Sequence, residues 1–281
     1  MKKVKLLVLL SLLFVCGCTN SGKTEIFGGD LVKNHVMYGS SSNAALAYEL
    51  PVISTEKITE FSIDQFYVSG EGDYKIEFEE LTGGSSYKNY YYYFAHISVA
   101  VSDESPADFS IESVDMCVNG KVVNYKISEM IFTNTIAKYP QYKDDESDLV
   151  YTSDVTFLYQ TIPDQAQQNI DLEAQSDCII KEFGALDYLN TENLDIYVNN
   201  NKENLDKEIK LNKGDELRIS FNLSYEKNIP EYSLLKTTRY ITYLNNDGTK
   251  CVFADPQGFM ILNYVNDNFI KQYIDNYIGD K

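Results

Sequence analysis

Two distant segments of this 281-residue chain alternate apolar and polar residues in the same way. They are "HISVAVS", residues 96–102, and "RISFNLS", residues 218–224. Because successive side chains of a strand point to opposite faces, this period of two predicts strands with one buried face. Sheets with one apolar face must bury it against another layer, so we predict an all-β sandwich architecture. The inward residues would be Ile97, Val99, Val101, Ile219, Phe221 and Leu223.

Two further segments carry turn signals between apolar runs. Residues 114–127 centre on Asn119-Gly120, and residues 239–253 centre on Asp247-Gly248. These dipeptides tolerate the positive φ angles of tight hairpin turns, which makes them the strongest short-range hairpin signal. Several strands with turns at this spacing predict antiparallel sandwiches of immunoglobulin-like type, although strand order does not follow from the pattern.

Matching residues recur at a constant offset along the chain. Residues 58–61, "ITEF", match residues 180–183, "IKEF", and 180 minus 58 is 122. Similar features in the same order favour an internal duplication over chance similarity. We therefore predict tandem sandwiches over residues 48–160 and 170–281, joined by a linker over 161–169 where the alternation lapses. The same offset also pairs Leu50 with Leu172 and Ile97 with Ile219.

The C-terminal segment departs from the β pattern. After Asn266 or Asp267, either of which can cap a helix, two rows of apolar residues recur at i, i+4 and i+8. This spacing predicts an amphipathic helix of about three turns. We expect the helix to pack on the second sandwich, and the alternative is a contact with a partner or a second copy. The two rows are Phe269, Tyr273, Tyr277 and Ile270, Ile274, Ile278.

The N-terminus carries the most specific motif in the chain. Three lysines in the first five positions precede a largely apolar stretch over residues 6–15, which is too short to span a bilayer and is typical of an export signal. It runs into "VCGC", residues 15–18, which resembles the lipobox of bacterial lipoproteins. The resemblance implies that residues 1–17 are a cleaved signal peptide and that Cys18 becomes a lipidated N-terminus. The alternative is an ordinary cleaved signal with incidental cysteines.

Residues 18–47 combine this cysteine with glycine and serine clusters and no sustained period. We predict a flexible tether that reaches roughly 30 Å from the membrane. The Asn-, Lys-, Ile- and Tyr-rich composition further suggests a Gram-positive cell envelope. The expected location is therefore the extracytoplasmic face of the cell membrane, at the cell surface.

Charge and motif content exclude several classes of function. The formal net charge of -18 repels phosphate backbones, so nucleic acid is not an expected partner. The sequence contains no GxSxG, HExxH or CxxC motif and no phosphate-binding glycine loop. We therefore predict no catalytic residues, no cofactor and no metal site, with a hydrolase of dispersed carboxylates as the open alternative. His96 is the one histidine within the predicted sandwiches.

Three cysteines remain once the lipobox is set aside. An odd number cannot pair completely within one chain. Only Cys178 and Cys251 would share a predicted domain, so they form the candidate disulfide of an exported protein. The alternative is that both, together with Cys117, are buried reduced thiols.

An aromatic cluster, "KNYYYYFAHISVAV" over residues 88–101, supplies the candidate binding residues. Alternation places Tyr90, Tyr92 and Phe94 on the face opposite the core, where so apolar a stripe should be covered. The cover could be the tether or second domain, a partner protein, or a sugar stacked on the rings. We predict a non-catalytic interaction protein, with glycan or small-ligand binding through this stripe as the alternative. The offset of 122 maps the three residues onto Asn212, Gly214 and Glu216, so strand formation alone does not require rings.

Overall fold

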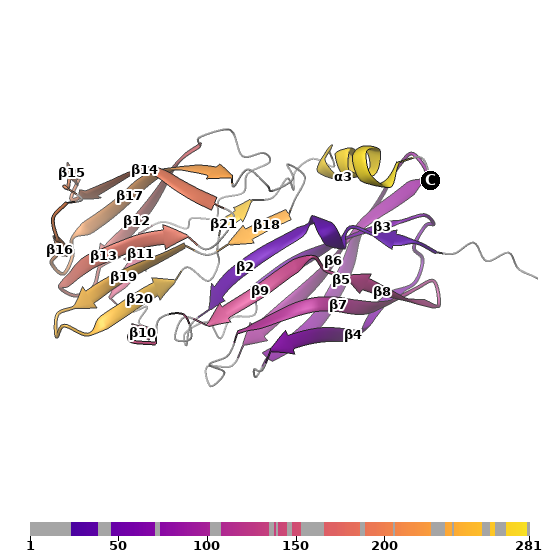
Figure 1. Cartoon of the computed structure of the whole chain (residues 1–281), viewed down its shortest axis with the longest axis horizontal. Helices are drawn as coiled ribbons and strands as arrows, with labels where there is room; N and C mark the ends of the chain where they lie inside the picture. The colour runs from indigo at the N-terminus through magenta and orange to yellow at the C-terminus, as the bar shows by residue number, and fades with distance from the viewer. Residues whose placement is uncertain are drawn as a thin grey trace, which may run out of the picture.

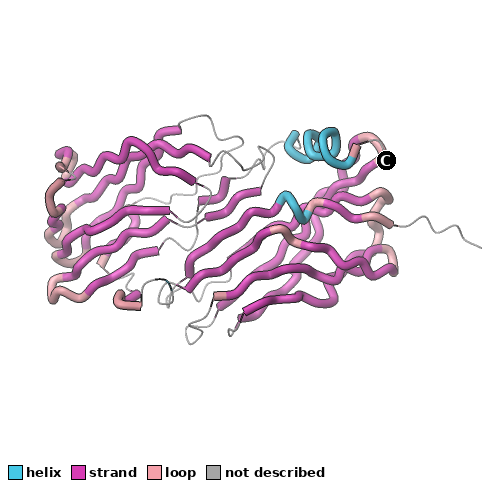
Figure 2. Tube along the Cα trace, in the orientation of Figure 1, coloured by secondary structure: helices cyan, strands magenta, loops and turns pink. Residues whose placement is uncertain are grey.

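The computed structural model confirms an all-β protein built from antiparallel sandwiches. The two sandwiches follow one another end to end along the long axis of the molecule (Figure 1). Strands make up most of the described chain, with a short helical turn near the N-terminus and a helix at the C-terminus (Figure 2). The lipobox, Asn266 and Asp267 lie outside the described residues. These are 24–38, 46–70, 74–101, 108–134, 138, 140–144, 148–152, 166–185, 189–204, 206–225, 234–237, 239–254, 259–261 and 268–279.

The first sandwich contains the two strand orders of a constant-type immunoglobulin domain. One sheet has the order A, B, E, D, and the other contains C, F and G together with additional strands. One sheet has the order β1 (Ile26–Phe27), β3 (Leu46–Ser54), β6 (Tyr90–Val101) and β5 (Tyr74–Tyr87). The other contains β2 (Val32–Tyr38), β9 (Glu129–Asn134), β7 (Phe109–Val118) and β4 (Phe61–Gly70), with β8 (Lys121–Lys126) also paired to β7. A 3₁₀ turn, η1 (Gly29–Leu31), joins β1 to β2.

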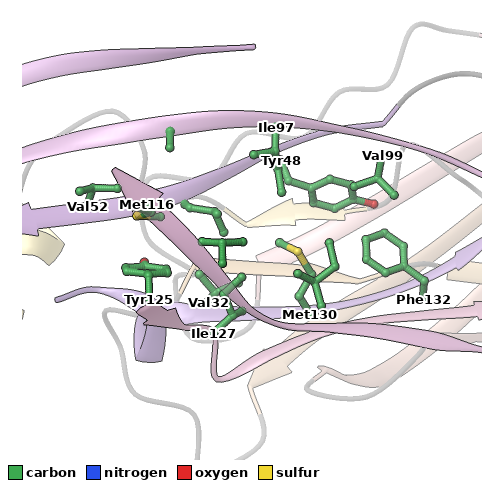
Figure 3. Close-up of a cluster of buried hydrophobic side chains, with 14 of the residues drawn as sticks. Val32, Tyr48, Val52, Ile97, Val99, Met116, Tyr125, Ile127, Met130 and Phe132 are labelled. Carbon is green, nitrogen blue, oxygen red and sulfur yellow. The ribbon is translucent and has the colours of Figure 1, made fainter. Parts of the chain in front are cut away.

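Apolar side chains from both sheets interlock to form the core of the first sandwich. Tyr48 and Ile97 come from one sheet, and Met116 and Phe132 come from the other (Figure 3). The rings of Phe109 and Phe132 stack with centroids 4.6 Å apart. Alternation along each strand therefore directs its apolar residues into this layer, as the sequence predicts.

The second sandwich repeats the same plan. Its core contains Leu172, Ile219, Phe221 and Tyr243. One sheet has the order β11 (Leu149–Tyr151), β12 (Ala166–Ala174), β17 (Glu216–Tyr225), β14 (Leu189–Val198) and β15 (Asn201–Lys202). The other has the order β10 (Lys143–Asp144), β20 (Lys250–Ala254), β19 (Arg239–Asn245), β13 (Cys178–Ala185) and β16 (Ile209–Leu211).

Both predicted hairpins are present. Strands β7 and β8 turn at Asn119 and Gly120, whose φ angles are 49° and 76°. Strands β19 and β20 turn through Gly248, at φ 83°. Positive φ is the conformation for which asparagine and glycine are suited, so the turn chemistry sets both hairpins.

In one sheet of each sandwich, the strand pairing agrees with the 122-residue offset of the repeat. In the other sheet, the offset between equivalent positions is different. Leu50 pairs with Ala95 in β3–β6, and adding 122 gives the observed pair Leu172 and Leu217 in β12–β17. In the facing sheets, however, the bulge after Ile63 in β4 corresponds to the bulge after Ile180 in β13, at an offset of 117. The match between residues 58–61 and 180–183 is therefore not a structural equivalence. Common ancestry of the two halves stays a prediction.

The predicted tether is wrong for residues 24–38. This segment forms β1, η1 and β2, and Leu31, Val32 and Val36 are fully buried. Its glycines reflect close packing: a Cβ at Gly29 would lie 1.7 Å from the carbonyl oxygen of Lys126. Glycine is required where two backbone segments approach so closely, which composition alone cannot distinguish from flexibility.

The boundary between the sandwiches also differs from the prediction. Strands β10 and β11 already belong to the second sandwich, and β12 begins at Ala166, so the linker prediction is wrong for residues 166–169. Residues 161–165 lie outside the described part. Strands β18 (Leu234–Thr237) and β21 (Phe259–Ile261) leave the second half and extend the sheet of the first, with β18 parallel to β2 (Figure 1). A backbone ladder therefore ties the two sandwiches together.

Candidate functional site

The aromatic stripe lies on β6, an interior strand between β3 and β5. Tyr93 belongs to the core cluster between the sheets, whereas Tyr90 and Tyr92 belong to a separate cluster on the outer face, with Phe94 packed against it. The alternation therefore assigned the two faces of this strand correctly.

The C-terminal helix covers the stripe. It consists of α3 (Asn268–Tyr273) and a π-helical turn, η2 (Ile274–Ile278), and lies on the first sandwich (Figure 1). Tyr90 and Tyr92 are only 4% and 3% exposed, and the rings of Phe94 and Phe269 lie 6.3 Å apart. The buried members of this interface are Leu31, Ile53, Tyr90, Tyr92, Phe269, Ile270, Tyr273, Ile274 and Ile278.

The expected packing of this helix on the second sandwich is therefore wrong. Both of its apolar rows are buried against the first sandwich, except Tyr277, which is 57% exposed. Helical periodicity indicates that a helix has an apolar face, but not which distant surface receives it.

Polar contacts fix the helix at the rim of this interface. The Tyr87 hydroxyl donates to Asp275 Oδ2 at 3.1 Å, and Lys88 Nζ lies 2.9 Å from Asp275 Oδ1. The Tyr273 hydroxyl donates to Asp30 Oδ1 at 2.5 Å. The hydrogen bond from Lys88, with a further one from Tyr87, holds the pKa of Asp275 below its ordinary value. Apolar burial and directional contacts thus act together at one interface.

The sequence predicts that Tyr90, Tyr92 and Phe94 are covered, either from within the chain or by a partner or sugar, and in the structure the C-terminal helix covers them. The rings form an internal docking surface for residues 268–279, in line with the alternative that a part of residues 170–281 covers them. A sugar or partner cannot stack on Tyr90 or Tyr92 while the helix is in place.

We expect Asp275→Asn to lower the melting temperature modestly at neutral pH. The pKa of Asp275 is depressed in the folded state, so its contribution is present above its unfolded pKa and disappears as pH falls through the folded pKa. The deficit relative to wild type should therefore become smaller as the pH falls. Paired melts at pH 7 and pH 3 measure it, and a pH-independent deficit would contradict the ionic contribution.

His96 lies further along the same face in a polar network. Its Nε2 is 2.7 Å from Thr82 Oγ1, and its Nδ1 is 3.4 Å from Glu49 Oε1. This order of carboxylate, imidazole and hydroxyl resembles a nucleophilic relay, which would also need backbone N–H donors for an oxyanion. Glu49 lies on β3, His96 on β6 and Thr82 on β5, so the network joins three neighbouring strands of one sheet.

An open groove runs between β4 and β5, where the two sheets of the first sandwich part. Its volume is about 850 Å³. Apolar side chains from both strands line it, and Asp64, Gln65, Tyr67 and Glu77 add polar groups. Sequence analysis did not predict this groove, because the groove depends on two edge strands that meet only in the fold. Its apolar lining residues are Ile63, Phe66, Val68, Tyr74, Ile76 and Phe78.

A smaller polar pocket of about 230 Å³ lies on the second sandwich. Arg218 and Asp171 line it and form an ion pair at 2.6 Å. Because the guanidinium is already matched by this carboxylate, the pocket has no charge bias toward an anionic ligand. The groove is therefore the stronger candidate surface.

The cysteines and acidic residues give no further site. Cys117, Cys178 and Cys251 form no disulfide in the structure, and burial raises the pKa of Cys178 to about 12, which keeps it a protonated, weakly reactive thiol. The described residues contain no group of three or more histidine, cysteine or acidic side chains that could hold a metal. Nor is any helix in the described part long and apolar enough to cross a membrane.

Comparison with known proteins leaves the family open. No protein-family model and no curated protein matches the chain. A solved structure of BcpA, the major pilin subunit of Bacillus cereus, aligns over 85% of this chain and 70% of its own, at 9% identity and TM-score 0.29. The N-terminal periplasmic domain of ScsB from Proteus mirabilis aligns over 80% and 91%, at 8% identity and TM-score 0.24. Likenesses this weak support no conclusion about function.

Proposed function

We propose that this protein is a lipid-anchored, extracytoplasmic protein that binds another protein and carries out no chemistry. The VCGC motif at residues 15–18 is the observation that carries the proposal. Thr24, the first residue that the structure describes, lies six residues after Cys18, so the chain between them spans at most about 20 Å. The first sandwich would then lie close to the membrane.

The joining of the two sandwiches supports a role as a rigid interaction module. Strand β18 pairs with β2, and the C-terminal helix packs on β6, so residues from the second half complete the first sandwich twice. A partner would meet a preorganised surface, which lowers the entropic cost of binding. Glycan binding depended on the aromatic stripe, which the helix covers, so we do not propose it.

Replacing Cys18 with serine should abolish the anchor. We expect wild-type protein to incorporate labelled fatty acid and to partition into detergent, and Cys18→Ser to do neither, because two or three acyl chains hold a protein on a membrane almost irreversibly. Cys16→Ser is the matched control and should behave as wild type. Wild-type protein that takes up no fatty acid would refute the anchoring proposal.

A further inference from the structure

We infer that the groove between β4 and β5 binds an extended, cationic segment of a partner protein, which adds as a strand to the edge of β4. This inference rests on the proposed function, because it names the surface and the chemistry of the partner. Adding a strand to an exposed edge is a common way to bind peptides: main-chain hydrogen bonds give affinity, and alternate side chains fill pockets.

Both walls of the groove are edge strands. Among the described residues, β4 pairs only with β7 and β5 only with β6. Each strand therefore presents a row of backbone N–H and C=O groups without a strand partner on its outer side. The apolar residues behind these edges are partly exposed and pack against the main core. An added strand could pair its backbone and bury its apolar side chains in the same place.

The second sandwich shows what fills the equivalent edge. Strand β13, whose bulge after Ile180 matches the bulge of β4 after Ile63, pairs with the short strand β16. Ile209 and Leu211 of β16 are 6% and 2% exposed, whereas Lys210 between them faces solvent. The strand that completes this edge thus has the pattern apolar, basic, apolar.

Among the described residues, no segment of the first sandwich pairs with the outer edge of β4 as β16 pairs with β13. In the second sandwich, β16 comes from the long connection between β15 and β17, residues 203–215. In the first, β5 ends at Tyr87 and β6 begins at Tyr90, so only Lys88 and Asn89 join them. Two residues make a tight turn and cannot supply a strand. Within the part of the chain that the structure describes, the outer edge of β4 is therefore open to a further strand.

Charge identifies the occupant as a cationic segment. Four exposed carboxylates and one lysine, Lys75, lie on β4 and β5. Lys75 pairs with Glu77 at 2.7 Å, so three of the four carboxylates remain as excess negative charge, of which Asp64 lines the groove. A second copy of this chain would bring the same acidic edge, and like charges on adjacent strands are destabilising. A strand with lysine or arginine between its apolar residues meets opposite charge instead. The four carboxylates are Asp64, Glu77, Glu79 and Glu80.

A peptide with the sequence of residues 207–213, KEIKLNK, is the probe. Added to the soluble chain 19–281, it should bind with slowed amide exchange at residues 61–68 of β4. The double variant Asp64→Lys with Glu77→Lys should weaken binding at least tenfold. A matched variant on the second sandwich, Glu203→Lys with Asp206→Lys, should not. The peptide KESKSNK, which lacks the apolar residues, should not bind.

Several results would overturn this inference. The first is that KEIKLNK does not bind. The second is that slowed amide exchange is confined to β13, because the peptide displaces β16. The third is that the two charge variants lose peptide affinity equally. Concentration-dependent dimerisation that protects residues 61–68 without peptide would identify a second copy as the occupant instead.

Photo-crosslinking on intact cells separates this inference from the proposed function. A crosslinking residue that replaces exposed Tyr67, in the groove, should capture a partner. The same residue in place of exposed Val150, on β11, should not capture that partner. A partner captured only from positions outside the groove would reject the groove and leave the proposed function standing. A protein that captures no partner from any exposed position would reject the proposed function itself.

Discussion

Removing residues 268–281 should strongly destabilise the first sandwich. The deletion exposes Tyr90 and Tyr92 and removes five buried apolar side chains of the helix, each of which contributes about 1.5–3 kcal/mol when fully buried. The total is comparable to the whole stability of a typical domain, about 5–15 kcal/mol. We expect the melting temperature to fall by more than about 10 °C. Hydrogen exchange should show the loss of protection in β6 before β17.

Point variants within the helix test the same interface without deleting it. Ile274→Ala removes a fully buried side chain and should cost about 2–5 kcal/mol of unfolding free energy. Tyr277→Ala, one turn away and 57% exposed, is the control and should cost about 0.5 kcal/mol or less. Equal costs for the two variants, or loss of protection that begins in β17, would contradict docking on the first sandwich.

Gly29→Ala should be among the most damaging single changes in the chain. The new Cβ would lie 1.7 Å from the carbonyl oxygen of Lys126, a backbone atom that cannot move without displacing β8. Overpacking against backbone costs about 3 kcal/mol or more. Urea unfolding of the soluble chain measures the loss.

Gly120→Ala is the control for backbone conformation alone. Its Cβ would meet nothing within 4 Å, and its φ of 76° should cost about 1–2 kcal/mol. If residues 24–38 were a flexible tether, Gly29→Ala would have no effect on stability, so a neutral result would contradict the observed packing of β1, η1 and β2.

The candidate sites were only partly predictable. Alternation correctly placed Tyr90 and Tyr92 away from the core between the sheets. The corresponding positions of the second half carry no rings, which indicated that these tyrosines pack against some further part of the chain or a partner. The groove between β4 and β5 could not be predicted, because it arises from two edge strands that belong to different sheets. Its acidic residues look like ordinary solvated charges until the strands are brought together.

The sequence by itself determined the class of several segments: strands from a period of two, hairpins from Asn119-Gly120 and Asp247-Gly248, and a helix from the rows at Phe269 and Ile270. It did not do so for residues 24–38, which form β1, η1 and β2. Only the tertiary structure decided where these segments pair, including β18 beside β2 and the helix on β6. Period and turn chemistry act over a few residues, so the local sequence records them directly. The choice of a distant edge or face depends on which apolar surfaces remain uncovered once every other element is in place.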